Sequence, residues 1–184
     1  MRNKDFEMKI AGKVLLHACC APCATHAIEL LQQHCSVTLF YSNSNIFPYD
    51  EYCKRFAEMK RLASIYACPL VEDSYDHDEW LAWVRGLEAE PEKGRRCLKC
   101  FEFNLGRAGV FARGNGFSGY TTTLTVSPHK RSGDIFKIGR QCGDFLAIDF
   151  KKKDGFKSSL ELSRKYALYR QHYCGCEFSR PSEA

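Results

Sequence analysis

The chain has 184 residues, of which 45% are hydrophobic and 27% charged, and its formal net charge is +5. This composition is that of a globular protein, and the length is that of one domain with a single core. No apolar run reaches the ~18 residues that a membrane helix needs, so we expect no membrane partner. Residues 1–7 lack the apolar stretch of a secretion signal. We therefore expect a cytoplasmic location and one domain covering residues 1–184.

Charge is distributed unevenly along the chain. Residues 1–92 carry 9 Lys and Arg against 14 Asp and Glu, whereas residues 93–184 carry 18 against 8. A basic half suggests a polyanionic partner, with nucleic acid as the first candidate. A solvated basic surface without a partner is the alternative that charge alone leaves open.

The first half of the chain alternates short apolar runs with helical periodicity. We predict strands at residues 14–19, 37–41 and 69–72, separated by a helix at 23–34 and a second helix after the loop at 43–48. The second helix has an apolar stripe, which we assign to the core, and a further helix lies around residues 80–84. The stripe consists of Tyr52, Phe56, Met59, Ala63 and Tyr66.

The second half continues the alternation. A helix is predicted from Cys97 to Phe111, followed by the clearest strand of the chain at 120–126, a helix at 134–142 and a last buried strand at 145–150. A final helix is expected to carry Leu162, Tyr166, Tyr169 and Tyr173 on one face. Alternating strands and helices predict an α/β fold with a mostly parallel sheet covered by helices on both faces.

The loop after the first strand is unusual. Residues 17–23 read His-Ala-Cys-Cys-Ala-Pro-Cys, at the place where nucleotide-binding α/β proteins usually have a glycine-rich turn for phosphate. A helix N-terminus favours ionised thiols, and the thiolate is the form that binds metal. The loop therefore predicts a site for a soft metal rather than for phosphate.

Eleven cysteines in a chain expected in the reducing cytosol favour metal binding or catalysis over disulfides. Seven of them lie where predicted elements meet loops, and two pairs have the Cys-x-x-Cys spacing that lets two thiolates reach one centre. Buried free thiols or a redox dithiol are the alternatives. Four thiolates would suit zinc or an iron–sulfur cluster equally, and seven are too many for one tetrahedral ion. The candidate metal ligands are Cys19, Cys20, Cys23, Cys97, Cys100, Cys174 and Cys176, and the expected packing residues are Cys35, Cys53, Cys68 and Cys142.

Several stretches together resemble the cobalamin-independent, QueH-type epoxyqueuosine reductase family, in order from about residue 14 to 179. One position departs from the family pattern: the loop that usually reads Asn-Pro-Asn-Ile-x-Pro has Ser44 in place of the proline, which bears on the rigidity of the loop. The matching stretches are His17-Ala-Cys-Cys-Ala-Pro-Cys23, Arg96-Cys-Leu-Lys-Cys-Phe101, Tyr120-Thr-Thr-Thr-Leu124 with Ser127-Pro128, Asp149-Phe-Lys-Lys152 and Tyr169-Arg-Gln-His-Tyr-Cys-Gly-Cys176.

The resemblance implies a single three-layer α/β/α domain like the nucleotide-binding domain of adenosine-nucleotide α-hydrolases. It also implies a [4Fe-4S] cluster with a second mononuclear iron, and reductive removal of the epoxide oxygen from epoxyqueuosine at the wobble position of a tRNA anticodon. The partners would be tRNA and an electron donor that the sequence does not identify. Two electrons and two protons would be consumed and water released.

Within this resemblance Cys19 and Asp149 are the candidate catalytic residues. For Asp149 the roles of metal ligand, proton donor and loop cap stay open, and His17 is expected to be a hydrogen-bonded strand-end residue rather than a ligand. The candidate substrate or tRNA contacts are Asn45, Glu51, Lys151, Lys152 and Arg170. For Glu51 the alternative is a helix-start carboxylate, and for the lysine run a solvated surface.

Two other functions compete with this interpretation. A tRNA sulfur-transfer enzyme of related fold would keep a Gly- or Ser-rich ATP loop after the first strand, where this chain has Cys19–Cys23. A zinc-bound RNA-binding module would be colourless after anaerobic purification.

Overall fold

The computed structural model describes residues 12–180. Residues 1–11 and 181–184 lie outside the described part. The expectation for residues 1–7 falls on them, and the single-domain prediction for residues 1–184 includes them. In chain order the elements are β1 (Lys13–His17), α1 (Ala21–Gln32), β2 (Ser36–Tyr41), α2 (Tyr49–Ile65), β3 (Leu70–Glu72), α3 (His77–Trp83), α4 (Arg95–Gly114), β4 (Gly119–Thr122), the 3₁₀ turn η1 (Thr123–Val126), α5 (Ser132–Cys142), α6 (Gly155–Lys165) and the 3₁₀ turn η2 (Glu177–Ser179).

The four strands form a parallel sheet in the order β3-β2-β1-β4. In the central strand β1, Leu16 pairs with Leu39 of β2 and His17 pairs with Thr122 of β4. All of β1 after its first residue is buried, as expected for a strand covered on both faces. Because the strands are parallel, their carboxyl ends meet at one edge of the sheet.

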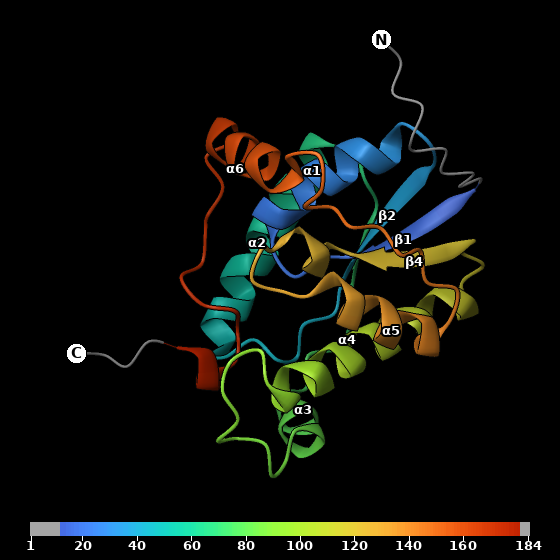
Figure 1. Ribbon diagram of the computed structural model, residues 1–184. Coiled ribbons are helices and arrows are strands. Elements are labelled where there is room, and N and C mark those ends of the chain that lie inside the picture. Colours follow the sequence, from blue (N-terminus) through green and yellow to red (C-terminus); the bar gives the residue numbers. More distant parts are fainter. Residues whose placement is uncertain (1–11, 181–184) are drawn as a thin grey trace.

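Helices cover both faces of this sheet (Figure 1). Alternating strand residues divide between two cores, since Leu16 and Leu39 pack with α1 and α2, whereas Leu15 and Phe40 pack with α4 and Ile135 of α5. The structure thus confirms an α/β fold with three α/β/α layers. No helix within residues 12–180 has the length and apolar character needed to cross a bilayer.

Helix α6 packs on α1 through small residues rather than through its large apolar ones. Gly155, Ser159 and Ser163 are the buried residues of α6, and a Cβ at Gly155 would lie 2.8 Å from the ring of His26 in α1. This spacing of four places all three small residues on one helix face, which lets the two backbones approach closely.

The prediction that Tyr169 and Tyr173 continue this last helix is wrong. The helix ends at Lys165 because Ala167 adopts a left-handed conformation with φ of 47°. The N–H groups of Ala167 and Leu168 then bond the carbonyls of Arg164 and Ser163, which is a Schellman arrangement. The chain therefore leaves the helix and runs toward the carboxyl edge of the sheet.

Two predicted strands are also wrong in extent. The run at 120–126 stops being a strand after Thr122, because the Thr122 hydroxyl accepts the N–H of Leu124 and starts η1. Residues 145–150 form a single parallel bridge, between Tyr120 and Phe145, in place of a strand. Beyond it the threonine hydroxyls of residues 121 and 125 bond the carbonyls of Leu146 and Ile148.

Candidate metal centre

The first thiol group lies at the switch point of the sheet. The chain turns from β1 to β2 on one side and later adds β4 on the other, and ligands of open α/β sheets bind at the carboxyl ends of the strands at such a point. The loop from β1 places Cys20 at the N-cap of α1, followed by Pro22 in the first turn. The sulfur atoms of Cys19, Cys20 and Cys23 all lie within 4.8 Å of one another, so these three residues could hold one metal ion.

The three thiols of this group shift one another's pKa values. The neighbouring thiols of Cys19 and Cys23 stabilise the Cys20 thiolate and lower the pKa of Cys20 well below its usual value. For Cys23 the neighbours are Cys19 and Cys20, and they raise its pKa. The thiolate is therefore favoured at Cys20, and because metal ligands must be deprotonated, metal binding would release protons from the other thiols.

His17 does not face this group as a ligand. The side chain is fully buried, its Nε2–H donates to the carbonyl of Ser42 at 3.1 Å, and its Nδ1 lies 2.9 Å from the Thr122 hydroxyl. Because a carbonyl only accepts, Nδ1 must accept from the hydroxyl. Burial also lowers the pKa of His17. The ring is hydrogen-bonded at a strand end, as expected.

A second thiol group comes from two segments that are distant in sequence. Cys97 and Cys100 lie on the first turns of α4, and Cys174 and Cys176 lie in the segment that follows α6. Burial raises the pKa of Cys100, and the nearby sulfurs of Cys174 and Cys176 raise it further. The backbone N–H of Lys93 donates to Cys97 Sγ at 3.3 Å.

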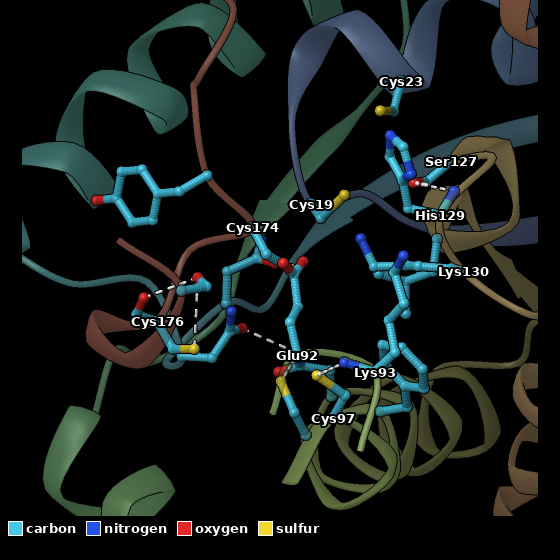
Figure 2. A pocket seen from close by; sticks show the side chains of 18 of the residues that line it. Cys19, Cys23, Glu92, Lys93, Cys97, Ser127, His129, Lys130, Cys174 and Cys176 are labelled. Atoms are coloured by element: carbon cyan, nitrogen blue, oxygen red, sulfur yellow. Dashed lines mark hydrogen bonds between the residues drawn. The ribbon is translucent and has the colours of Figure 1, made fainter. Parts of the chain in front are cut away.

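Both groups border one cavity of about 470 Å³. Figure 2 shows Cys97 and Cys176 on one side of it and Cys19 and Cys23 on the other. Six of the seven predicted thiols line the wall, and Cys20 lies behind it. A volume of this size fits a nucleoside-sized ligand.

The C-terminal thiols are held in place by a buried arginine of α2. Arg55 Nη1 and Nη2 donate to the carbonyls of Cys174 and Tyr173 at 3.0 and 3.3 Å, and Nε donates to Glu51 Oε1 at 2.7 Å. The hydroxyl of Tyr169 adds a bond to Glu51 Oε2 at 2.9 Å. Glu51 therefore belongs to the anchor of this segment and does not line the cavity.

The loop with Ser44 is also fixed by hydrogen bonds. Ser44 is 1% exposed, its hydroxyl accepts the N–H of Asp76 at 3.1 Å, and its carbonyl lies 2.8 Å from His77 Nδ1. These bonds hold the loop where the family pattern has a proline.

The other predicted contacts divide into two sets. Asn45 and Arg170 line the cavity, whereas Asp149, Lys151 and Lys152 do not. Asp149 Oδ1 lies 3.4 Å from Lys151 Nζ. That ammonium donates to the carbonyls of residues 125 and 130 and to the Ser132 hydroxyl, so it braces the loop before α5.

That braced loop carries residues that sequence reasoning missed. His129, Lys130 and Arg131 line the cavity. In the sequence, only the preceding Ser127-Pro128 marks this stretch, as part of the family resemblance. Burial opposes a charge on Lys130, but the sulfurs of Cys174 and Cys19 outweigh it and raise the pKa of the ammonium. Figure 2 shows Lys130 on the cavity wall beside Cys19.

The surroundings of the second thiol group fit an anionic centre. Arg96 is 2% exposed and has no carboxylate partner among the described residues. Its Nη1 bonds the carbonyls of residues 87, 88 and 90 while Nε has no partner. The indole N–H of Trp80 is buried without an oxygen or nitrogen partner and faces the Cys100 sulfur. Buried donors without partners are costly, and an anionic iron–sulfur group held by these thiols would accept from them.

Comparison with known proteins gives one consistent result over nearly the whole chain. The family profile described as Epoxyqueuosine reductase QueH matches residues 14–182. A protein of that name from Streptococcus pyogenes is 38% identical, over 92% of this chain and 71% of its own length. Proteins of the same name from Acinetobacter baylyi and Thermotoga maritima are 36% and 32% identical, over 92% and 91% of this chain and 81% and 90% of their own lengths. The chain therefore belongs to the epoxyqueuosine reductase QueH family.

Proposed function

We propose that this protein reduces epoxyqueuosine to queuosine at the wobble position of tRNA, in the cytoplasm. The observation that carries the proposal is the cavity at the switch point of the sheet, which has six cysteines on its wall and borders a group of three sulfurs within 4.8 Å of one another. This is a site for metal-dependent redox chemistry in a family whose relatives bear the name of that reaction.

The reaction defines what the site must supply. Converting an epoxide to an alkene breaks two C–O bonds, consumes two electrons and two protons, and releases the oxygen as water. A [4Fe-4S] cluster would supply the electrons one at a time, and an adjacent iron would polarise the epoxide oxygen as a Lewis acid. The residues of the chain must hold these groups, orient the substrate and provide protons.

We assign the two thiol groups to different centres. Cys97, Cys100, Cys174 and Cys176 would hold the cluster, because a multi-iron cluster needs ligands spread around it. The Trp80 N–H faces the Cys100 sulfur, and the Arg96 guanidinium is near enough to favour the thiolates of Cys97 and Cys176. Cys19, Cys20 and Cys23 would hold the single iron, since zinc–thiolate bonds of ~2.3 Å show that ligand sulfurs of one ion lie close together.

Lys130 is the best-placed proton donor. Its ammonium lies on the cavity wall near the sulfurs of both groups, where it would hold a proton at Nζ for the departing oxygen. Asp149 and Lys151 then act through the loop that carries Lys130. Cys19, whose sulfur lies 3.5 Å from the Thr123 hydroxyl, keeps its proposed place at the reacting centre.

The positive charge around the cavity supports the proposal that tRNA is the partner. Five Lys and Arg residues line the cavity against two acids. Among them Lys93, Arg131 and Arg170 are exposed and could contact phosphates on both sides of an unstacked wobble nucleotide. Lys151 is engaged by backbone carbonyls and Lys152 does not line the cavity, so we place the main phosphate contacts at the rim.

The competing functions are less well supported. A sulfur-transfer enzyme would need a phosphate-binding turn after β1, where three thiols lie instead. A zinc-bound RNA-binding module would leave no role for a nucleoside-sized cavity between two thiol groups.

The test is turnover of an anticodon stem-loop carrying epoxyqueuosine by anaerobic, iron-replete protein with a chemical reductant. Nucleoside mass analysis should show the loss of one oxygen, and Cys100→Ser should abolish it while Cys35→Ser should not. Unchanged epoxyqueuosine with iron-replete protein would overturn the proposal. Transfer of sulfide to a base would favour the sulfur-transfer enzyme.

A further inference from the structure

Two buried amide groups lie on the cavity wall. Asn43 follows β2 and Asn104 lies in α4; both line the cavity and are 2% and 3% exposed. The side-chain carbonyl oxygen of each is buried without a hydrogen-bond partner. A buried acceptor of this kind costs free energy unless a donor reaches it.

Hydrogen bonds fix which way each amide points. Asn43 Nδ2 donates to the carbonyl of Ala18 at 3.0 Å, and that carbonyl can only accept. Asn104 Nδ2 donates to Asn45 Oδ1 at 2.9 Å and lies 3.7 Å from Cys100 Sγ. The nitrogen of each amide therefore donates to the protein, while each carbonyl oxygen is left for a donor from another group.

Each of the two amides lies beside one of the thiol groups. Ala18, which binds Asn43, directly precedes Cys19, and Asn104 lies one helical turn after Cys100. Asn45 joins them, since it accepts from Asn104 and is two residues from Asn43. A ligand that reaches both carbonyl oxygens would thus be placed beside both thiol groups.

The chemistry of these oxygens selects the ligand. Thiolates, sulfides and phosphates are acceptors and cannot pair with a carbonyl oxygen. The matching group carries hydrogen-bond donors, and the part of epoxyqueuosine that must lie beside the thiols is its epoxide-bearing carbocycle, which carries hydroxyl groups.

We propose that Asn43 and Asn104 form a pair of acceptors that binds the hydroxyl groups of the substrate's carbocycle and so positions the epoxide between the two thiol groups. This inference rests on the proposed function and deepens it. A site built around a hydroxyl discriminates strongly against an analogue without it, because its buried acceptors are then left unpaired.

The experiment measures binding of two stem-loops to metal-loaded protein by fluorescence anisotropy. One stem-loop carries epoxyqueuosine, and the other carries the same deazaguanine base with an aminomethyl group but no carbocycle. Asn43→Leu and Asn104→Leu should each weaken binding of the first roughly tenfold and leave binding of the second unchanged. Asn115→Leu is the matched control, an exposed amide at the C-cap of α4.

Three results would overturn the proposal: equal losses for both stem-loops, which indicate recognition of the base; no loss for either; or loss of iron in the variants, which indicates a metal ligand. If a leucine variant does not fold, serine at the same position removes the carbonyl with a smaller change in shape and is compared in the same way. If the variants lose affinity only for the stem-loop with the carbocycle, but the wild type does not turn it over, the acceptor pair is supported and the proposed function is contradicted. If the wild type turns over epoxyqueuosine but binds both stem-loops equally well, the proposed function is supported and the acceptor pair is contradicted.

Discussion

The two thiol groups of this protein are built in different ways. Cys19, Cys20 and Cys23 lie within five residues, on the turn from β1 into α1, and their sulfurs are already within 4.8 Å of one another. The second group joins α4 to a segment about 75 residues later that has no regular secondary structure at Cys174. One site is thus specified by a local turn, and the other by tertiary contacts through Arg55.

Because the two groups are built differently, they should be lost under different conditions. The first group depends on the fold of the sheet itself, so it persists as long as the core does. The second depends on a short segment that Glu51 and Arg55 fasten to α2, so it can be lost while the core stays folded. Local opening of such segments costs less than global unfolding.

The largest expected effect separates metal ligands from packing thiols. Cys97→Ser or Cys100→Ser should abolish the broad visible absorption of the iron–sulfur group, because a hydroxyl is a poor substitute for a thiolate. Cys68→Ser should retain iron and cost only ~1–3 kcal/mol of unfolding free energy for an ill-matched buried polar group. Iron analysis and chemical denaturation check both outcomes, and equal iron loss in the two kinds of variant would contradict the assignment.

Lys130 lies on the cavity wall near sulfurs of both groups, so a variant of this residue tests whether the groups serve one reaction. Lys130→Met should lower the single-turnover rate by ~10²–10⁴-fold, the contribution typical of a positioned proton donor. Iron content should stay at the wild-type level. Lys152→Met, which alters an exposed lysine that does not line the cavity, is the control. A normal rate in the Lys130 variant would remove this residue from the chemistry.

Arg55 tests the dependence of the second group on its anchor. Arg55→Lys keeps the charge but replaces the three-nitrogen guanidinium by one nitrogen, which cannot reproduce the bonds that separate nitrogens of Arg55 make to the two carbonyls and to Glu51. In metal-free protein, alkylation of Cys174 should become several times faster while that of Cys23 is unchanged, as followed by mass spectrometry. Arg61→Lys is the control, since Arg61 also lies on α2 but bonds the carbonyls of Tyr166 and Ala167. Equal acceleration at Cys23 would mean that the two groups are not independent.

The smallest expected effect concerns the rim. Arg131→Ala and Lys93→Ala should each weaken tRNA binding modestly and reduce the slope of log affinity against log salt by about one. Arg131 is suited to this test because its side chain is 86% exposed. Lys152→Ala should leave the slope unchanged, and a larger change there would return the phosphate contacts to the lysine run.

Local patterns predicted the first group and the α/β fold, because a strand, a turn and a helix are encoded within about 20 residues. The cavity could not be predicted in the same way. The last helix ends because Ala167 is left-handed, and hydrophobic periodicity does not reveal such a residue. The periodicity therefore predicts Tyr173 on the helix face, where it does not lie. The role of Lys151 in bracing the loop of Lys130, and that of Arg55 in holding Cys174, depend on contacts between distant segments.

We propose that the two thiol groups hold different iron centres. Iron and acid-labile sulfide should be counted in anaerobically reconstituted wild-type protein and in Cys23→Ser. We expect wild-type iron to exceed sulfide by one atom per chain, and the variant to lose that excess while keeping equal amounts of iron and sulfide. Equal iron and sulfide in the wild type, or loss of sulfide together with iron in Cys23→Ser, would contradict the claim.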